Sequence, residues 1–272
     1  MSIHLRLLNY FTFLFLLTQS AFAADTAFEG YYKITIGGQH SGYVVQQYVV
    51  DAAKKEMTTT YYIYAKAGTN TTIESLVAKC DLSFEPKSYQ YSAVVNGQAQ
   101  SVDASFKNKK MTAKMTKAGK SQNVTLDVPA NGFLSSFLNY VILKNGMMVG
   151  KTYDFFALPE EAPACYVGDT QCKATDVGFA KGTASIKAEQ KLIGVDSYKI
   201  DFNFKSVPFT GFISAKGETL GSASPMQNLT TELVKTRAEA VANFPFKESH
   251  IKALFGGIPA GTKNSLVEKK GN

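Results

Sequence analysis

Apolar and polar residues alternate along most of the chain, which is the pattern of strands that bury one face. Up to residue 128 the alternating stretches are 31–36, 43–50, 57–66, 75–84, 88–97, 98–107, 110–117 and 121–128, with turn residues such as Asn96-Gly97 between them. The pattern resumes over 151–158, 182–194, 196–205, 209–224 and 228–236. Consecutive strands at this spacing predict a mainly β protein, built as a large curved antiparallel sheet or an open, barrel-like meander.

One segment between the two β-rich regions has the spacing of a helix instead. Its apolar residues recur four apart in two adjacent sets, Phe133, Phe137 and Val141, and Leu134, Leu138 and Ile142. Asn131 can cap the start and Gly146 can end it. We expect an amphipathic helix over about 131–145, packed on the concave face of the sheet. If it fills the concavity, the sheet is simply a packed core; if it fills only part, a pocket for an apolar ligand remains.

The C-terminal region carries a helix signal followed by a change in composition. Thr236 and Glu239 have the spacing of a capping box, which predicts a short helix over about 236–244. Residues 245–272 then become rich in Gly and Lys, and such a tail is either docked or disordered. We therefore expect a single antiparallel β domain over 24–244, followed by this tail.

The first 23 residues resemble a secretory signal peptide. Arg6 precedes an apolar run over 7–17, and small residues at Ala21 and Ala23 place the cleavage site before Ala24. The alternative is an uncleaved membrane anchor, but the run is shorter than the roughly 20 residues that cross a bilayer. We expect an exported protein, periplasmic in a Gram-negative bacterium and otherwise secreted, with no transmembrane segment after cleavage.

Cysteine usage agrees with export. Cys165 and Cys172 lie in a short loop that contains Pro and Gly, where an oxidising compartment would let them form a disulfide. The alternative is half of a zinc site, but its remaining ligands would have to come from Cys80, His40 and His250, so no metal is predicted. Cys80 lies in an apolar stretch and is interpreted as a small buried hydrophobe.

The excess of basic charge is concentrated in one stretch. The whole chain carries a formal charge of +7, and much of the excess lies between residues 106 and 121. This stretch contains Lys107, Lys109, Lys110, Lys114 and Lys117. These lysines either contact an anionic surface, such as lipid head groups, or keep a solvated strand from pairing with other chains; the second interpretation is favoured. Nucleic acid is not an expected partner of an exported protein.

Candidate catalytic groups are sparse and lie in no recognisable motif. The plausible bases are His40, in a hairpin turn, and His250, in the tail. Paired carboxylates for glycosidic chemistry would have to come from Glu56, Glu74, Asp81 and Glu85. Isolated acids on alternating strands normally face solvent, so we predict no catalytic residue and no cofactor.

The order of these pieces resembles a β-rich domain of unknown function found in exported bacterial envelope proteins. It is also similar to the domain that precedes the catalytic core of some exported transglutaminase-like proteins. The likeness spans roughly 30–241 and is carried by YYKITIGGQHSGY, FEPKSYQYS, VGKTYDFFAL, GVDSYKIDF, GETLGSAS and LVKTRAEAV. The resemblance implies a large, strongly curved antiparallel sheet and no activity, because the chain ends before a catalytic core could begin.

These expectations favour a non-catalytic protein of the cell envelope that acts as a structural or partner-binding module through a curved β surface. The alternative is a carrier for a lipid or another apolar ligand held in the concavity, and a hydrolase is less favoured than either. The expected partner is accordingly an envelope protein or a lipid.

Overall fold

Fifteen strands form one sheet in the computed structural model, which describes residues 24–161 and 178–268. The strands are β1 (Asp25–Ile36), β2 (Gln39–Asp51), β3 (Glu56–Ala67), β4 (Asn70–Asp81), β5 (Pro86–Val95), β6 (Gln98–Lys107), β7 (Lys110–Lys117), β8 (Lys120–Asp127), β9 (Phe133–Leu134), β10 (Thr152–Leu158), β11 (Ala180–Leu192), β12 (Val195–Phe204), β13 (Val207–Ser214), β14 (Thr219–Ser224) and β15 (Leu229–Val234). The prediction of a mainly β fold with a large antiparallel sheet is confirmed.

The sheet is open, and its strands form two runs on either side of β1. Strands β2 to β8 follow β1 in sequence order on one side, and β15 to β10 follow in descending order on the other. The two halves join through antiparallel pairing of β1 with β15, in which Tyr31 lies opposite Val234. Strand β9 adds to β10 in parallel, so β8 and β9 are the two edges and the sheet does not close.

Turn residues explain why consecutive strands pair with their neighbours. Asn96 and Gly97 both have positive φ, 51° and 80°, between β5 and β6. This is the conformation of the tight hairpin turn whose twist matches that of the strands, and it favours Asn followed by Gly. Ala118-Gly119 repeats it between β7 and β8, with φ of 48° and 79°.

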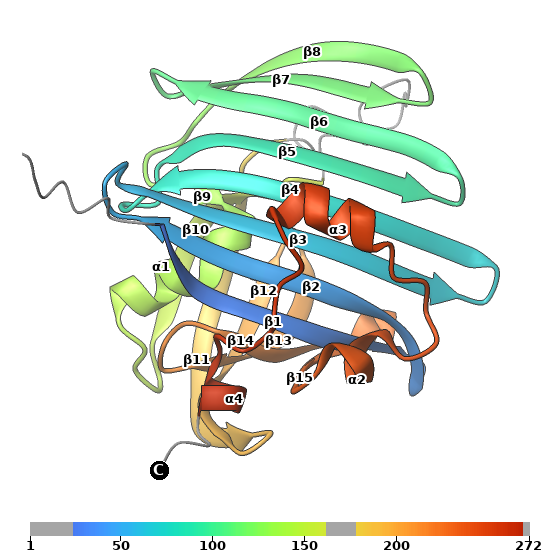
Figure 1. Ribbon diagram of the computed structural model, residues 1–272. Helices are drawn as coiled ribbons and strands as arrows, with labels where there is room; N and C mark the ends of the chain where they lie inside the picture. The colour runs from blue at the N-terminus through green and yellow to red at the C-terminus, as the bar shows by residue number, and fades with distance from the viewer. Residues whose placement is uncertain (1–23, 162–177, 269–272) are drawn as a thin grey trace, which may run out of the picture.

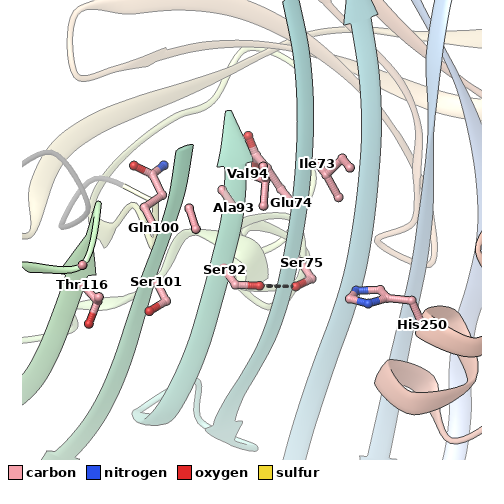
Figure 2. A pocket seen from close by; sticks show the side chains of 12 residues that line it. Ile73, Glu74, Ser75, Ser92, Ala93, Val94, Gln100, Ser101, Thr116 and His250 are labelled. Atoms are coloured by element: carbon pink, nitrogen blue, oxygen red, sulfur yellow. Dashed lines mark hydrogen bonds between the residues drawn. The ribbon is translucent and has the colours of Figure 1, made fainter. Parts of the chain in front are cut away.

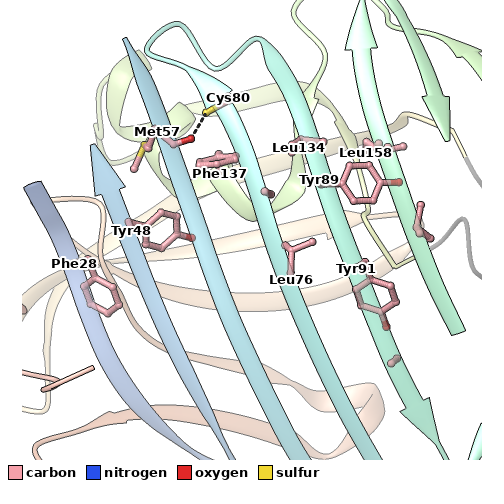
Figure 3. Close-up of a cluster of buried hydrophobic side chains, with 14 of the residues drawn as sticks. Phe28, Tyr48, Met57, Leu76, Cys80, Tyr89, Tyr91, Leu134, Phe137 and Leu158 are labelled. Atoms are coloured by element: carbon pink, nitrogen blue, oxygen red, sulfur yellow. Dashed lines mark hydrogen bonds between the residues drawn. The ribbon is translucent and has the colours of Figure 1, made fainter. Parts of the chain in front are cut away.

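The sheet curls, so that one face is turned inward, toward the far half of the molecule (Figure 1). On this inner face of β4 to β6, Leu76, Tyr89 and Val102 belong to one buried cluster together with Leu134 of β9 and Leu158 of β10 (Figure 3). Residues from distant parts of the chain therefore share one core, which we call the inner cluster. The opposite face of the same strands is called the outer face below.

The segment predicted to be the concave-face helix does lie inside the curl, but only its second half is α-helical. Helix α1 covers Leu138–Asn145 and follows the 3-10 turn η1, Ser135–Phe137. Phe133 and Leu134 are extended because they pair with Ala157 and Leu158 of β10. The predicted start at residue 131 is therefore wrong, since strand pairing outweighs the local helical spacing.

The C-terminal residues are docked on the sheet, with α2 and α3 on the outer face of β1 to β3 and Leu266 of α4 against the inner cluster. They form α2 (Arg237–Val241), α3 (Glu248–Phe255) and α4 (Ser265–Glu268), and a short 3-10 turn, η4 (Pro225–Gln227), precedes β15. The predicted cap is present, because Thr236 Oγ1 accepts a hydrogen bond from the Glu239 N–H at 3.2 Å. Helix α2 packs on β1 and β2, and α3 packs on β3 (Figure 1). We call residues 236–268 the outer cover.

Candidate functional site

The outer cover is anchored to the strands beneath it by apolar packing and by hydrogen bonds from phenols. Tyr31, Tyr43 and Tyr62 are buried against Ala240, Val241 and Ile251. The Tyr31 hydroxyl donates to the Pro259 carbonyl at 2.7 Å, and the Tyr43 hydroxyl donates to the Pro245 carbonyl at 2.8 Å. The backbone of Glu29 also donates to the Lys263 carbonyl at 2.9 Å. These contacts join residues of the segment 245–268 to β1 and β2.

Beyond β3 the outer face of the sheet carries hydroxyl side chains instead of aromatic rings. The strand registers place one hydroxyl on each of five neighbouring strands in a single row, made of Ser75, Ser92, Ser101, Thr116 and Ser121. The Ser75 and Ser92 oxygens lie 2.7 Å apart, and those of Thr116 and Ser121 lie 2.9 Å apart. We call this set the hydroxyl row; it crosses β4 to β8 at a right angle to the strands.

A groove of about 280 Å³ follows the hydroxyl row at the margin of the outer cover. Its lining includes Ser75, Ser92, Ser101 and Thr116, the apolar residues Ile73, Val94 and Ala99, and His250 of α3. Figure 2 shows His250 at the α3 side of the groove, facing the paired Ser75 and Ser92. The groove exists because α3 rests on β3 and rises above the uncovered strands next to it.

The groove presents neutral hydrogen-bonding groups. Glu74 contributes to its lining, but the alternation of β4 places the side chain of this residue on the inner side, with Leu76. Burial and the neighbouring Glu161 raise the pKa of Glu74. Hydrogen bonds join hydroxyls of the row to one another, Ser75 to Ser92 and Thr116 to Ser121. The arrangement presents hydroxyl groups and small apolar surfaces side by side.

The predicted residues of the 131–145 segment are brought together inside the curl. Leu134 and Phe137 have no exposed surface and join the inner cluster, where the Phe137 ring lies 6.1 Å from that of Tyr48 and 6.4 Å from that of Phe84. The remaining four, Phe133, Leu138, Val141 and Ile142, pack in a second cluster around Phe155 and Phe202. Val141 is the least buried of the six. They act as a plug, and we use that name for residues 133–142.

The five predicted lysines do not share one face. Lys110 and Lys114 alternate with the buried Met111, Ala113 and Met115, so they point outward. Lys117 is an odd number of residues from both and lies on the other side of the strand. Lys107 and Lys109 flank the turn between β6 and β7, and Lys110 pairs with Asp127 at 2.7 Å. Contact of the whole set with an anionic surface stays a prediction.

The other candidate residues have structural partners or lie outside the described residues. Cys165 and Cys172 fall outside, and so does the predicted signal peptide. Cys80 is fully buried, its Sγ lies 3.8 Å from the Met57 carbonyl, and burial raises the pKa of its thiol. His40 Nε2 lies 3.0 Å from the carbonyl oxygens of Gly42 and Ala240, which ties the first hairpin to α2.

Three of the four acids considered for glycosidic chemistry lie near one another at one end of β3 and β4, where Glu56 is opposite Asp81 and Asp81 lines a second groove with Glu85. Glu56 forms salt bridges with Lys79 and Lys87 at 3.5 and 3.3 Å. Asp81 accepts hydrogen bonds from the backbone N–H groups of Ser83 and Glu85, at 2.7 and 2.9 Å, and so shapes the turn after β4. Glu74 lies near the opposite end of that strand, on the inner side.

Glu160 is an important residue that the sequence analysis missed. It is 2% exposed and lies just after β10, where it accepts hydrogen bonds from the Ser135 and Ser136 hydroxyls, each at 2.6 Å, and from the Ser136 N–H at 3.2 Å. Burial raises its pKa to about 7, although the serine hydrogen bonds act in the opposite direction. The carboxyl group therefore ties the plug to β10. Nothing in the local sequence around residue 160 predicts burial of this side chain.

Within 24–161 and 178–268, no group of three or more His, Cys, Asp or Glu side chains is placed to hold a metal ion. No helix in these ranges has the length and apolar character needed to cross a membrane.

Comparison with known proteins gives no basis for assigning a function. No family model matches the sequence, and no curated protein matches it. Among solved structures, the chain is similar to a crystal structure of a DUF1089 family protein from Pseudomonas aeruginosa, with 7% sequence identity and a TM-score of 0.38. That similarity covers 68% of this chain and 90% of the other. A function has to be argued from the site itself.

Proposed function

We propose that the protein is a non-catalytic binding module that contacts its partner through the open outer face of β4 to β8. The observation that carries the proposal is the incomplete outer cover. Residues 236–268 bury the aromatic outer face of β1 to β3, and they leave most of the outer face of the next five strands uncovered beside a groove of about 280 Å³. With the predicted signal peptide, the proposed place of action is the cell envelope.

The inner face supports this choice over the lipid-carrier alternative. A carrier needs space for an acyl chain inside the curl. Leu134, Phe137 and Leu158 occupy the centre of the inner cluster and have no exposed surface. The plug thus takes the place that an apolar ligand would need, and the outer face is the one that remains for a partner.

The hydrolase alternative has less support still. Two carboxylates must flank the bond to be cleaved, one as acid and one as base or nucleophile. Glu56 is neutralised by two lysines and Asp81 is used by a turn. Glu74 lies on the other face from the groove.

Site-specific photo-crosslinking in living cells tests the proposal. The photoreactive residue benzoylphenylalanine replaces Gln90, which is exposed on the outer face of β5, or Asn203, which is exposed on β12 in the other half of the sheet. We expect a specific adduct from position 90 and none from position 203. Thermal unfolding of both purified variants should match that of the wild type. Absence of an adduct at position 90, or equal adducts at both positions, contradicts the proposal.

A further inference from the structure

We infer that the groove beside α3 binds an extended, uncharged glycan whose chain lies across the strands along the hydroxyl row. This inference rests on the proposed function and names the class of ligand for the same surface.

The chemistry of the lining is the first argument. Each Ser or Thr hydroxyl has one donor and two acceptor positions, so a hydroxyl that already bonds its neighbour can still bond a ligand hydroxyl. Ser92, Ser101 and Thr116 supply such groups along the floor. Ile73, Val94 and Ala99 supply small apolar patches next to them. Alternating hydroxyls and C–H surface are also what a sugar ring presents.

The absence of charge along the floor points to a neutral ligand. The hydroxyl row itself carries no ionisable side chain, and His250 stands at its α3 end. The nearest lysine on the outer face of β7 is Lys114, which lies opposite Asp103 in the register. A phosphate or carboxylate polymer would require cationic side chains in the groove to offset its desolvation. An uncharged polyol meets the described lining without that cost.

The spacing of the row favours an extended chain. Neighbouring strands lie about 4.8 Å apart, so the row offers one hydroxyl at each such step and crosses five strands over ~19 Å. A glycan in an extended conformation, laid at a right angle to the strands, advances by about one ring per strand. A glycan that curls, as α-linked glucose chains do, would leave the row after one or two rings.

A peptide fits the same place less well. An extended peptide binds a sheet through main-chain hydrogen bonds at an exposed edge. The groove lies on a face, over β4 to β7, where the strands on either side already pair with the backbone groups of each strand. Only side chains are offered to a ligand there.

The chain provides a matched pair of variants for the test. The groove triple is Ser92→Ala, Ser101→Ala and Thr116→Ala. The control triple is Ser88→Ala, Ser105→Ala and Thr112→Ala, which changes the same strands on the same face, four residues along each strand and outside the groove lining. Both sets remove three exposed or half-buried hydroxyls, so thermal unfolding of both should stay near that of the wild type.

The measurement is an NMR titration of the isotope-labelled protein with defined hexasaccharides. Cellohexaose and chitohexaose are the extended probes, and maltohexaose is the curled control built from the same sugar as cellohexaose. We expect the extended probes to shift the backbone signals of the groove residues and maltohexaose to leave them unchanged. The groove triple should weaken binding of the extended probes by about tenfold or more, because it removes three hydrogen-bonding groups, and the control triple should not.

Three outcomes would overturn the inference: no shifts with either extended probe, equal effects of the two triples, or a preference for maltohexaose. The crosslinking result separates this failure from that of the proposed function. If a protein adduct forms at position 90 but no glycan binds, the proposed binding module is retained and the glycan inference is rejected. If neither an adduct nor glycan binding is observed, both proposals are rejected.

Discussion

The two faces of the same sheet are covered in different ways, and this difference is the basis of the proposed binding surface. The plug lies between the two halves of the curled sheet and is buried on both sides, in the inner cluster and in the cluster around Phe155. Most of the outer cover lies on the opposite face, over β1 to β3, although Ile73 of β4 also packs against it and Leu266 near its end reaches the inner cluster. An inner face that meets the rest of the molecule has to be filled completely. The outer face has no such requirement, and the part that the described residues leave uncovered is the part proposed to contact a partner.

The outward-facing side chains also differ between the covered strands β2 and β3 and the uncovered strands β5 to β7. Outward positions on β2 and β3 include Tyr43 and Tyr62, which the outer cover buries. Outward positions on β5 to β7 include Ser92, Ser101 and Thr116, which stay in contact with solvent. Large rings would be unfavourable on a bare face, and small hydroxyls would gain little beneath a cover. The types of outward-facing residue on each strand therefore change where the outer cover ends.

Removing the outer cover is expected to have the largest effect. Truncation after Phe244 would expose Tyr43 and Tyr62 and remove the carbonyl acceptors of the Tyr31 and Tyr43 hydroxyls. We expect loss of soluble folded protein, with strong binding of a hydrophobic dye by what remains. Truncation after Glu268 is the control and should leave circular dichroism and soluble yield unchanged. Folded, soluble protein from the shorter truncation would show that the cover is only an accessory.

A substitution within the plug is expected to have the second-largest effect on stability. Phe137→Ala removes a fully buried ring and should cost about 3 to 5 kcal/mol in the free energy of unfolding. Val141→Ala, in the same segment but only partly buried, is the control and should cost much less. Urea unfolding with and without added phospholipid measures both. A small loss for Phe137→Ala together with stabilisation by lipid would support a hinged lid and the carrier alternative.

The hydrogen-bonded Glu160 carboxyl, which joins the plug to β10, should have a smaller, pH-dependent effect on the free energy of unfolding. Because burial raises the pKa of Glu160 from 4.5 to about 7, the folded state holds this proton more tightly than the unfolded state. The resulting stabilisation is complete below about pH 4.5 and is lost as the pH rises through about 7, by about 3 kcal/mol for a raised pKa of this size.

Glu160→Gln should therefore flatten the dependence of the unfolding free energy on pH between 5 and 8. Its neighbour Glu161, which is exposed, provides the control, and Glu161→Gln should keep most of the wild-type slope. Chemical denaturation at a series of pH values measures all three proteins. An unchanged slope in Glu160→Gln would show that the buried carboxyl does not titrate in this range.

Strand positions could be predicted from the sequence because a strand repeats every two residues and its turns have strong local preferences. The stretch predicted at 110–117 is β7, Lys110–Lys117, and Asn96-Gly97 forms the expected turn. The cap at Thr236 was equally local, since its partner Glu239 is three residues away. The alternation of β7 also places Lys114 and Lys117 on opposite faces, a distinction that the prediction of one lysine-rich surface did not make.

Tertiary structure alone decided which faces are covered and where the site lies. Phe133 and Leu134 have helical spacing, yet they become a strand because β10 offers them backbone partners. The groove needs hydroxyls from four strands in register and His250 from a helix near the C-terminus. The burial of Glu160 depends on Ser135 and Ser136, which are distant in sequence. Local patterns encode the conformation of a segment, but the partner of a strand or a buried charge is set by long-range packing.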